Sequence, residues 1–175
     1  MCSIVARNVN IFAQIDQDPM ESRGLPPYVR LQHPISEERQ PMSINHEALI
    51  QAMVLVSVSD GDMADSELES IGRIVRYAPV FDGFNVDELS NIAEACIAAL
   101  SQDEGVDLIM ASLLTKLDVD LRETAYAFAL DVAAADAVIT DEEMSVLEML
   151  RHRLDIDRLI AAGIERGARA RFHRA

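Results

Sequence analysis

The sequence predicts an all-α protein, a compact bundle of about seven helices with an internal duplication of a helix–acidic turn–helix unit. Three observations support this prediction. Half of the 175 residues are apolar, apolar residues recur with helical spacing beyond residue 42, and one acidic segment occurs twice. Leu, Ile, Ala, Val and Met dominate and Trp is absent, a composition that favours helix over sheet.

Seven segments carry apolar residues every three to four positions, as one face of a helix requires. We expect helices at about 46–59, 65–77, 86–101, 103–117, 120–135 and 141–154, and a last helix that starts near Asp157. Their inward faces include Leu49, Ile71, Cys96, Val106, Phe128 and Met144. Because short connections join so many amphipathic helices, a compact bundle is expected.

Residues 1–41 differ from the rest of the chain. They hold five of the six prolines, their charges nearly balance, and no helical period persists. Such a segment favours disorder, and we interpret it as an N-terminal extension. The helical domain then spans 42–175, since Met42 is followed by residues able to cap an apolar helix.

The net charge of −15 limits the classes of partner. An acidic surface repels nucleic acid and anionic bilayers, whereas it suits solubility, basic protein partners or divalent cations. No signal peptide is apparent, and the longest apolar stretch, 48–58, is shorter than the about 20 residues that a membrane span needs. Cys2 and Cys96 lie too far apart in sequence to suggest a disulfide framework. We therefore expect a cytoplasmic protein with reduced thiols.

Two segments align without gaps and define the duplicated unit. Four residues of the first are identical in the second: Val56, Asp60, Asp65 and Glu67 match Val132, Asp136, Asp141 and Glu143. Three further residues of the first segment, Met63, Leu68 and Ile71, align with apolar residues of the second. Self-similarity of this kind predicts a repeated architecture, in which a helix enters, an acidic turn follows and a helix leaves.

The acidic turns are candidate metal sites, because Ca²⁺ and Mg²⁺ prefer several oxygen ligands around one point. The candidate ligands are Asp60, Asp62, Asp65 and Glu67 in the first turn, and Asp136, Asp141 and Glu143 in the second. Asp60 and Asp136 follow the entering helices, where the helix dipole disfavours an anion. A compensating cation, Ca²⁺ or Mg²⁺, is therefore the candidate cofactor.

Helix capping explains part of the same pattern without a metal. Thr140 followed by Glu143 has the spacing of an N-terminal capping box. Asp65 and Asp141 suit the first turn of a helix, and Gly61 suits a left-handed helix end. The sequence leaves both readings open, and capping accounts least well for Asp60 and Asp136.

The two acidic segments resemble the TerB family, the tellurite-resistance-associated helical domain. The residues behind the resemblance are Asp60-Gly61, Asp65-Ser66-Glu67-Leu68 and, more closely, Val132-Ala133-Ala134-Ala135-Asp136 with Glu142-Glu143. It covers roughly 43–171 and implies a duplicated helical fold without catalytic activity, a link to tellurite and other stress responses, and divalent-metal binding by the acidic residues. Ala137 and Val138 replace Gly61 and Asp62 in the second copy, so the two turns are not equivalent sites.

We therefore expect a non-enzymatic TerB-like domain that acts through protein partners and a divalent cation. Two alternatives remain: an interaction scaffold whose acidic groups only cap helices, and an enzyme with a pocket between the repeats. Cys96 and the methionines are expected in the core. The C-terminal arginines are expected to stabilise the end of the last helix, or to contact an acidic partner: Arg166, Arg169, Arg171 and Arg174.

Overall fold

The structure is a computed structural model that describes residues 42–59, 61, 63, 65–135 and 139–173. The predicted N-terminal extension, residues 1–41, lies outside the described residues. So do three of the candidate ligands, Asp60, Asp62 and Asp136.

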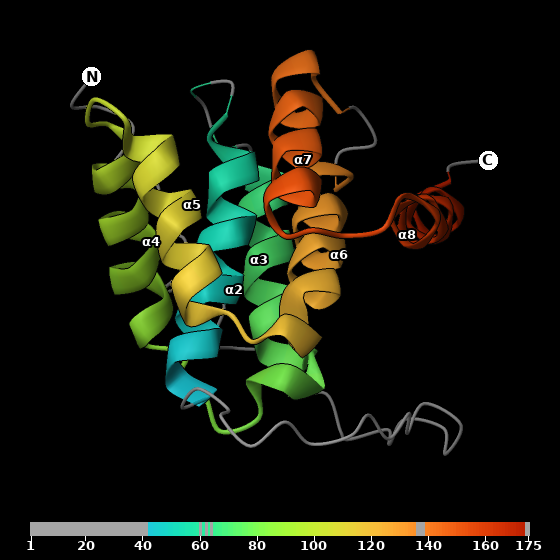
Figure 1. The fold of residues 1–175 in the computed structure, drawn as a ribbon. Coiled ribbons are helices and arrows are strands. Elements are labelled where there is room, and N and C mark those ends of the chain that lie inside the picture. The colour runs from blue at the N-terminus through green and yellow to red at the C-terminus, as the bar shows by residue number, and fades with distance from the viewer. Residues whose placement is uncertain (1–41, 60, 62, 64, 136–138, 174–175) are drawn as a thin grey trace.

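The described part of the chain contains seven α-helices and no strand, which confirms the predicted all-α bundle (Figure 1). The α-helices are α2 (Met42–Ser57), α3 (Asp65–Tyr77), α4 (Glu88–Leu100), α5 (Gly105–Lys116), α6 (Arg122–Ala133), α7 (Asp141–Arg153) and α8 (Arg158–Arg171). Two short 3₁₀-helices, η3 (Pro79–Phe81) and η4 (Val119–Leu121), lie in the connections. No helix in this part of the chain has the length and apolarity to cross a membrane.

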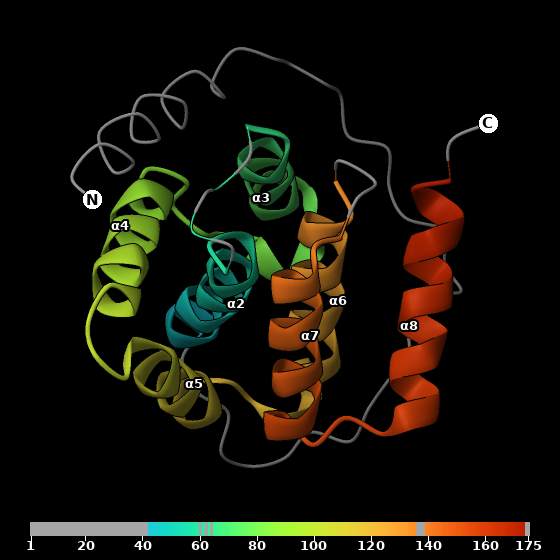
Figure 2. The same cartoon turned by 90° about the horizontal axis from the view of Figure 1, so that it is seen from above.

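Helix α2 occupies the centre of the bundle and contacts α3, α4, α5, α6 and α7 (Figure 2). Its apolar residues from Ala48 to Val56 are at most 2% exposed, so the helix is buried on all sides. A helix that is apolar all round must be covered all round, and the neighbouring helices provide that cover. The sequence analysis had assigned this helix only one buried face.

Three local predictions need correction. Helix α2 begins at Met42, four residues before the predicted start, and Asn45, a residue able to cap a helix, instead lies in its first turn and bonds to Asp118. Val106 and Met144, both predicted to face inward, are 39% and 46% exposed. Val106 lies in the first turn of α5 at an exposed corner, and Met144 lines an open pocket.

The corner between α4 and α5 has a constrained backbone. Glu104 adopts a left-handed conformation with φ of 62°, which is unfavourable for a residue that has a Cβ atom. At the next residue, Gly105, an added Cβ would lie 2.3 Å from the carbonyl oxygen of Ala99. The end of α4 therefore passes against the start of α5 too closely for any side chain at Gly105.

Helix α8 packs at the edge of the bundle, on the side opposite α4 and α5 (Figure 1 and Figure 2). Asp157 caps it by accepting hydrogen bonds from the amides of Leu159 and Ile160, at 2.7 and 3.4 Å. Its fully buried apolar residues are two small ones, Ala161 and Ala168. Small contact residues leave an unfilled space between α8 and α7, described below.

Candidate functional site

The second acidic turn contains the predicted capping box. The backbone amide of Thr140 donates to Glu143 Oε2 at 2.7 Å, and the amide of Glu143 donates to Thr140 Oγ1 at 3.1 Å. The Thr140 hydroxyl also donates to Glu143 Oε2, at 3.0 Å. Glu143 is 5% exposed, and its carboxylate is used to start α7. Capping therefore accounts for Glu143, whereas Asp141 is exposed in the first turn of the same helix.

The helices on either side of the first acidic turn end and begin at the same aligned positions as the helices around the second. Ser57 and Ala133 end the entering helices three residues before Asp60 and Asp136. Asp65 and Asp141 begin the leaving helices. This correspondence agrees with the alignment, although the duplication itself stays a prediction from the sequence.

The structure also describes Gly61, Asp65 and Glu67 of the first turn. Gly61 has φ of +91°, and its amide donates to the carbonyl of Val58 at 3.0 Å. This is the left-handed conformation expected where the chain leaves a helix. Asp65 is exposed, whereas Glu67 is 5% exposed, like its counterpart Glu143.

The metal hypothesis now depends on fewer residues. Within the described ranges, no three His, Cys, Asp or Glu side chains come together in a way that would hold a metal ion. Glu143 is used as a cap, and the aspartates that capping explained least well, Asp60 and Asp136, lie outside the described residues together with Asp62. A divalent cation at the acidic turns therefore stays a prediction.

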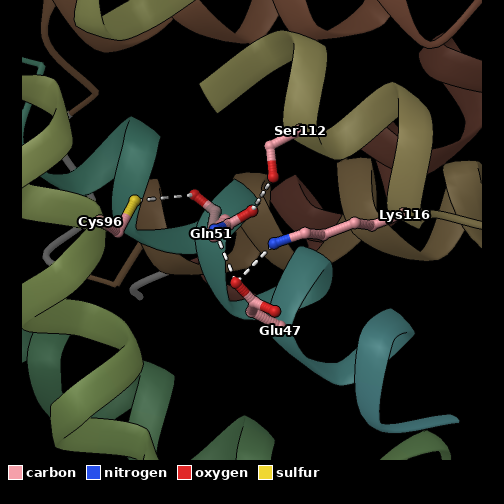
Figure 3. Close-up of polar contacts among 5 residues, drawn as sticks. All are labelled: Glu47, Gln51, Cys96, Ser112 and Lys116. Atoms are coloured by element: carbon pink, nitrogen blue, oxygen red, sulfur yellow. Dashed lines mark hydrogen bonds and ion pairs between the residues drawn. The ribbon is translucent and has the colours of Figure 1, made fainter. Parts of the chain in front are cut away.

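A polar cluster joins helices α2 and α5 (Figure 3). Gln51 on α2 donates to Glu47 Oε1 at 3.2 Å and accepts from the Ser112 hydroxyl of α5 at 3.1 Å. Lys116 reaches the same Glu47 oxygen at 2.6 Å. These contacts position α5 against α2.

Cys96 of α4 adjoins this cluster, with its Sγ 4.0 Å from the carbonyl oxygen of Gln51. It is 1% exposed, which confirms the predicted core position. Burial raises the pKa of its thiol from an ordinary 9.0 to about 12, the Glu47 carboxylate adds to the increase, and Lys116 opposes it. A buried and protonated thiol is a poor nucleophile, so this cysteine has a structural role.

An open pocket of about 360 Å³ lies between α6, α7 and α8. Tyr126 and Leu130 of α6 form part of its wall, Leu147 of α7 faces them, and Glu165 and Arg169 come from α8. The Tyr126 hydroxyl donates to Glu165 at 2.8 Å. The pKa of Tyr126 is raised above its ordinary value, mainly by burial and to a smaller extent by this hydrogen bond.

The sequence analysis missed this pocket. It assigned the C-terminal arginines to the end of the last helix, and Arg169 and Arg171 do lie in the last turn of α8. Their contacts are more specific: Arg171 pairs with Asp131 of α6, and Arg169 lines the pocket. The only sequence signal was the spacing of Glu165 and Arg169 on one face of an amphipathic helix, which does not reveal what that face meets.

The side of the bundle that holds α4 and α5, opposite α8, is strongly acidic. From Tyr77 to Thr115 the chain has seven acidic residues and no Lys, Arg or His. Three of the acids gather at the α4–α5 corner, where Asp103, Glu104 and Asp107 are exposed beside Leu108, which is 58% exposed. Asp107 pairs with Arg153 of α7 at 3.0 Å, through two side chains that are largely exposed to solvent.

No protein-family model, curated protein or solved structure matches this chain. The resemblance to the TerB family therefore rests on the residues of the two acidic segments.

Proposed function

We propose that this chain is a non-enzymatic, cytoplasmic TerB-like domain that acts in the response to tellurite or other stress by binding a basic protein partner. The observation that supports the proposal most directly is the acidic α4–α5 corner with its exposed apolar residues. Val106 and Leu108 are 39% and 58% exposed there, among acidic side chains. Apolar anchors within a charged rim are typical of a surface that binds another protein.

The charge distribution favours a basic partner over an acidic one. The chain has no basic residue between Tyr77 and Thr115, the stretch that holds α4 and most of α5, whereas α8, on the opposite side, carries four arginines. The basic side chains next to this stretch, Lys116 and Arg153, pair with Glu47 and Asp107. Complementary charge steers the encounter, and like charge at the contact suppresses the wrong partner. The same acidic surface disfavours nucleic acid as a ligand.

The proposed absence of catalysis is supported by how the polar side chains are used. Asn45 binds Asp118, His46 Nε2 lies 2.8 Å from the carbonyl oxygen of Val80, and Gln51 binds Ser112. These bonds connect secondary-structure elements, so the side chains contribute to architecture.

The proposal is tested by crosslinking in cells under tellurite stress, with mass spectrometry to locate crosslinks. The comparison uses wild-type chain and the variants Leu108→Ser and Asp103→Asn. We expect crosslinks from the α4–α5 corner to basic segments of one partner, and a loss of that partner in both variants. Val119→Ser is the matched control, since Val119 is 70% exposed outside the corner. Equal loss of the partner in the control, or contacts only at other surfaces, would contradict the proposal.

The second proposal is a divalent cation at the acidic turns. It is favoured by the equivalent placement of Asp60 and Asp136, each three residues after a helix ends. Calorimetric titration with Ca²⁺, Mg²⁺ and Mn²⁺ should show binding tighter than millimolar that the double variant Asp60→Asn/Asp136→Asn removes. Binding weaker than this, or unchanged in the double variant, would leave capping as the role of these turns.

A further inference from the structure

The pocket between α6, α7 and α8 combines apolar walls with two basic side chains, those of Arg169 and His173. Leu130, Leu147 and Ala168 are at most 4% exposed and line its interior. Ile139 and Phe172 extend the apolar wall. The volume of about 360 Å³ lies near the lower end of small-molecule sites, about 300–1,000 Å³. The space therefore suits one small apolar body better than a helix of another protein.

The charged groups at this pocket are not equally available. Glu165 accepts the hydrogen bond from Tyr126, and Arg171, which does not line the pocket, is bound to Asp131. Arg169 lines the pocket and has no ion pair with another described residue. On a chain of net charge −15, a guanidinium that pairs with no carboxylate of the described residues and lies beside an apolar pocket favours a ligand that brings its own anionic group.

We propose that this pocket binds an amphipathic monoanion, a straight-chain alkyl carboxylate whose tail lies between α7 and α8 and whose head group pairs with Arg169. This goes beyond the proposed partner surface, because α8 lies on the side of the bundle opposite α4 and α5. A single negative charge suits the pocket, since Glu165 and the acidic chain oppose a more highly charged ligand. Each methylene buried between the helices strengthens binding about fourfold until the space is full.

The test is calorimetric titration of the full chain with octanoate, decanoate and dodecanoate. We expect affinity to rise along the series. Arg169→Gln should weaken decanoate binding about tenfold, the loss of one charge-assisted contact. The matched control is Arg166→Gln, which removes the same charge from the same helix at a residue that does not line the pocket. Decanol should bind both variants and the wild type equally, because it lacks the anionic group.

A second variant tests the apolar wall. Met144 is 46% exposed and lines the pocket, so Met144→Glu should fold normally while placing a carboxylate beside the ligand tail. We expect it to lower the affinity for all three carboxylates, with an unchanged circular dichroism spectrum and melting temperature.

Three outcomes would overturn the inference. One is the absence of carboxylate binding, and another is equal weakening by Arg169→Gln and Arg166→Gln. The third is a dimer in sedimentation that Met144→Glu dissociates, which would make a second copy of the chain the occupant. None of these depends on the partner surface, which is assayed with Leu108→Ser, so failure of one proposal is distinguishable from failure of the other.

Discussion

Asn45 and Asp118 exchange two hydrogen bonds across the 73 residues that separate them in sequence. The Asn45 side chain donates from Nδ2 to Asp118 Oδ2 at 3.0 Å and accepts from the Asp118 backbone amide at 2.9 Å. Asn45 is fully buried in the first turn of α2. The pair therefore ties the start of the central helix to the connection between α5 and η4.

Replacing Asn45 with Ala should destabilise the protein by about 1–3 kcal/mol, because both bonds are lost and buried polar groups are left without these partners. Chemical denaturation of wild type and variant measures the change. Asn91→Ala on α4 is the control, since Asn91 is exposed. If Asn45→Ala were as stable as the control, the pair would have no net effect on the fold.

The capping box at α7 gives a second prediction. Thr140→Ala should cost about 0.5–2 kcal/mol, since the amide of Glu143 loses its acceptor. Glu143→Gln should cost less, because an amide oxygen can still accept from the Thr140 amide. Thermal unfolding in Mg²⁺ and in EDTA separates the two roles of Glu143: a cap is indifferent to the cation, whereas a metal ligand is not.

The α4–α5 corner predicts opposite effects at two adjacent residues. Glu104→Gly should stabilise the protein by about 1 kcal/mol, because glycine adopts positive φ without the steric cost of a Cβ. Gly105→Ala should destabilise it by about 1–3 kcal/mol, because the new Cβ meets the Ala99 carbonyl oxygen.

Gly163→Ala is the control for the corner. Apart from the neighbouring backbone of α8 itself, no described heavy atom lies within 4 Å of where its Cβ would be, and it occupies the interior of α8. This substitution should leave stability unchanged or raise it by up to about 1 kcal/mol. Equal effects of Ala at Gly105 and Gly163, measured by urea denaturation, would contradict the close approach described for the corner.

The raised pKa of Cys96 predicts how the folded chain behaves at high pH. In the folded protein the thiol keeps its proton up to about pH 12, whereas in the unfolded chain it ionises around 9.0. Its contribution to stability is therefore fully present below pH 9 and is lost as the pH rises toward 12. Thiolate absorbance and iodoacetamide labelling of Cys2→Ser should show an unreactive Cys96 at pH 9 that reacts after denaturation. Labelling at the same rate in both states would refute its burial.

Much of the fold was predictable because helical periodicity is a local property. Both ends of α3 and the start of α7 were predicted to the residue. The start of α8, predicted near Asp157, lies one residue later at Arg158. The capping box followed from the four residues Thr140 to Glu143 alone. Such features depend on neighbours in sequence, whose separation is set by the helix itself.

What the sequence determined by itself was the all-α class, the acidic character and the cap of α7. Only the tertiary structure decided that α2 is surrounded, that Asn45 meets Asp118, and that Arg169 faces a pocket while Arg171 holds Asp131. Periodicity defines the apolar face of a helix but not which helix covers it. Which side chains meet depends on packing between segments far apart in the chain, and for α8, docked through Ala161 and Ala168, that packing left a space.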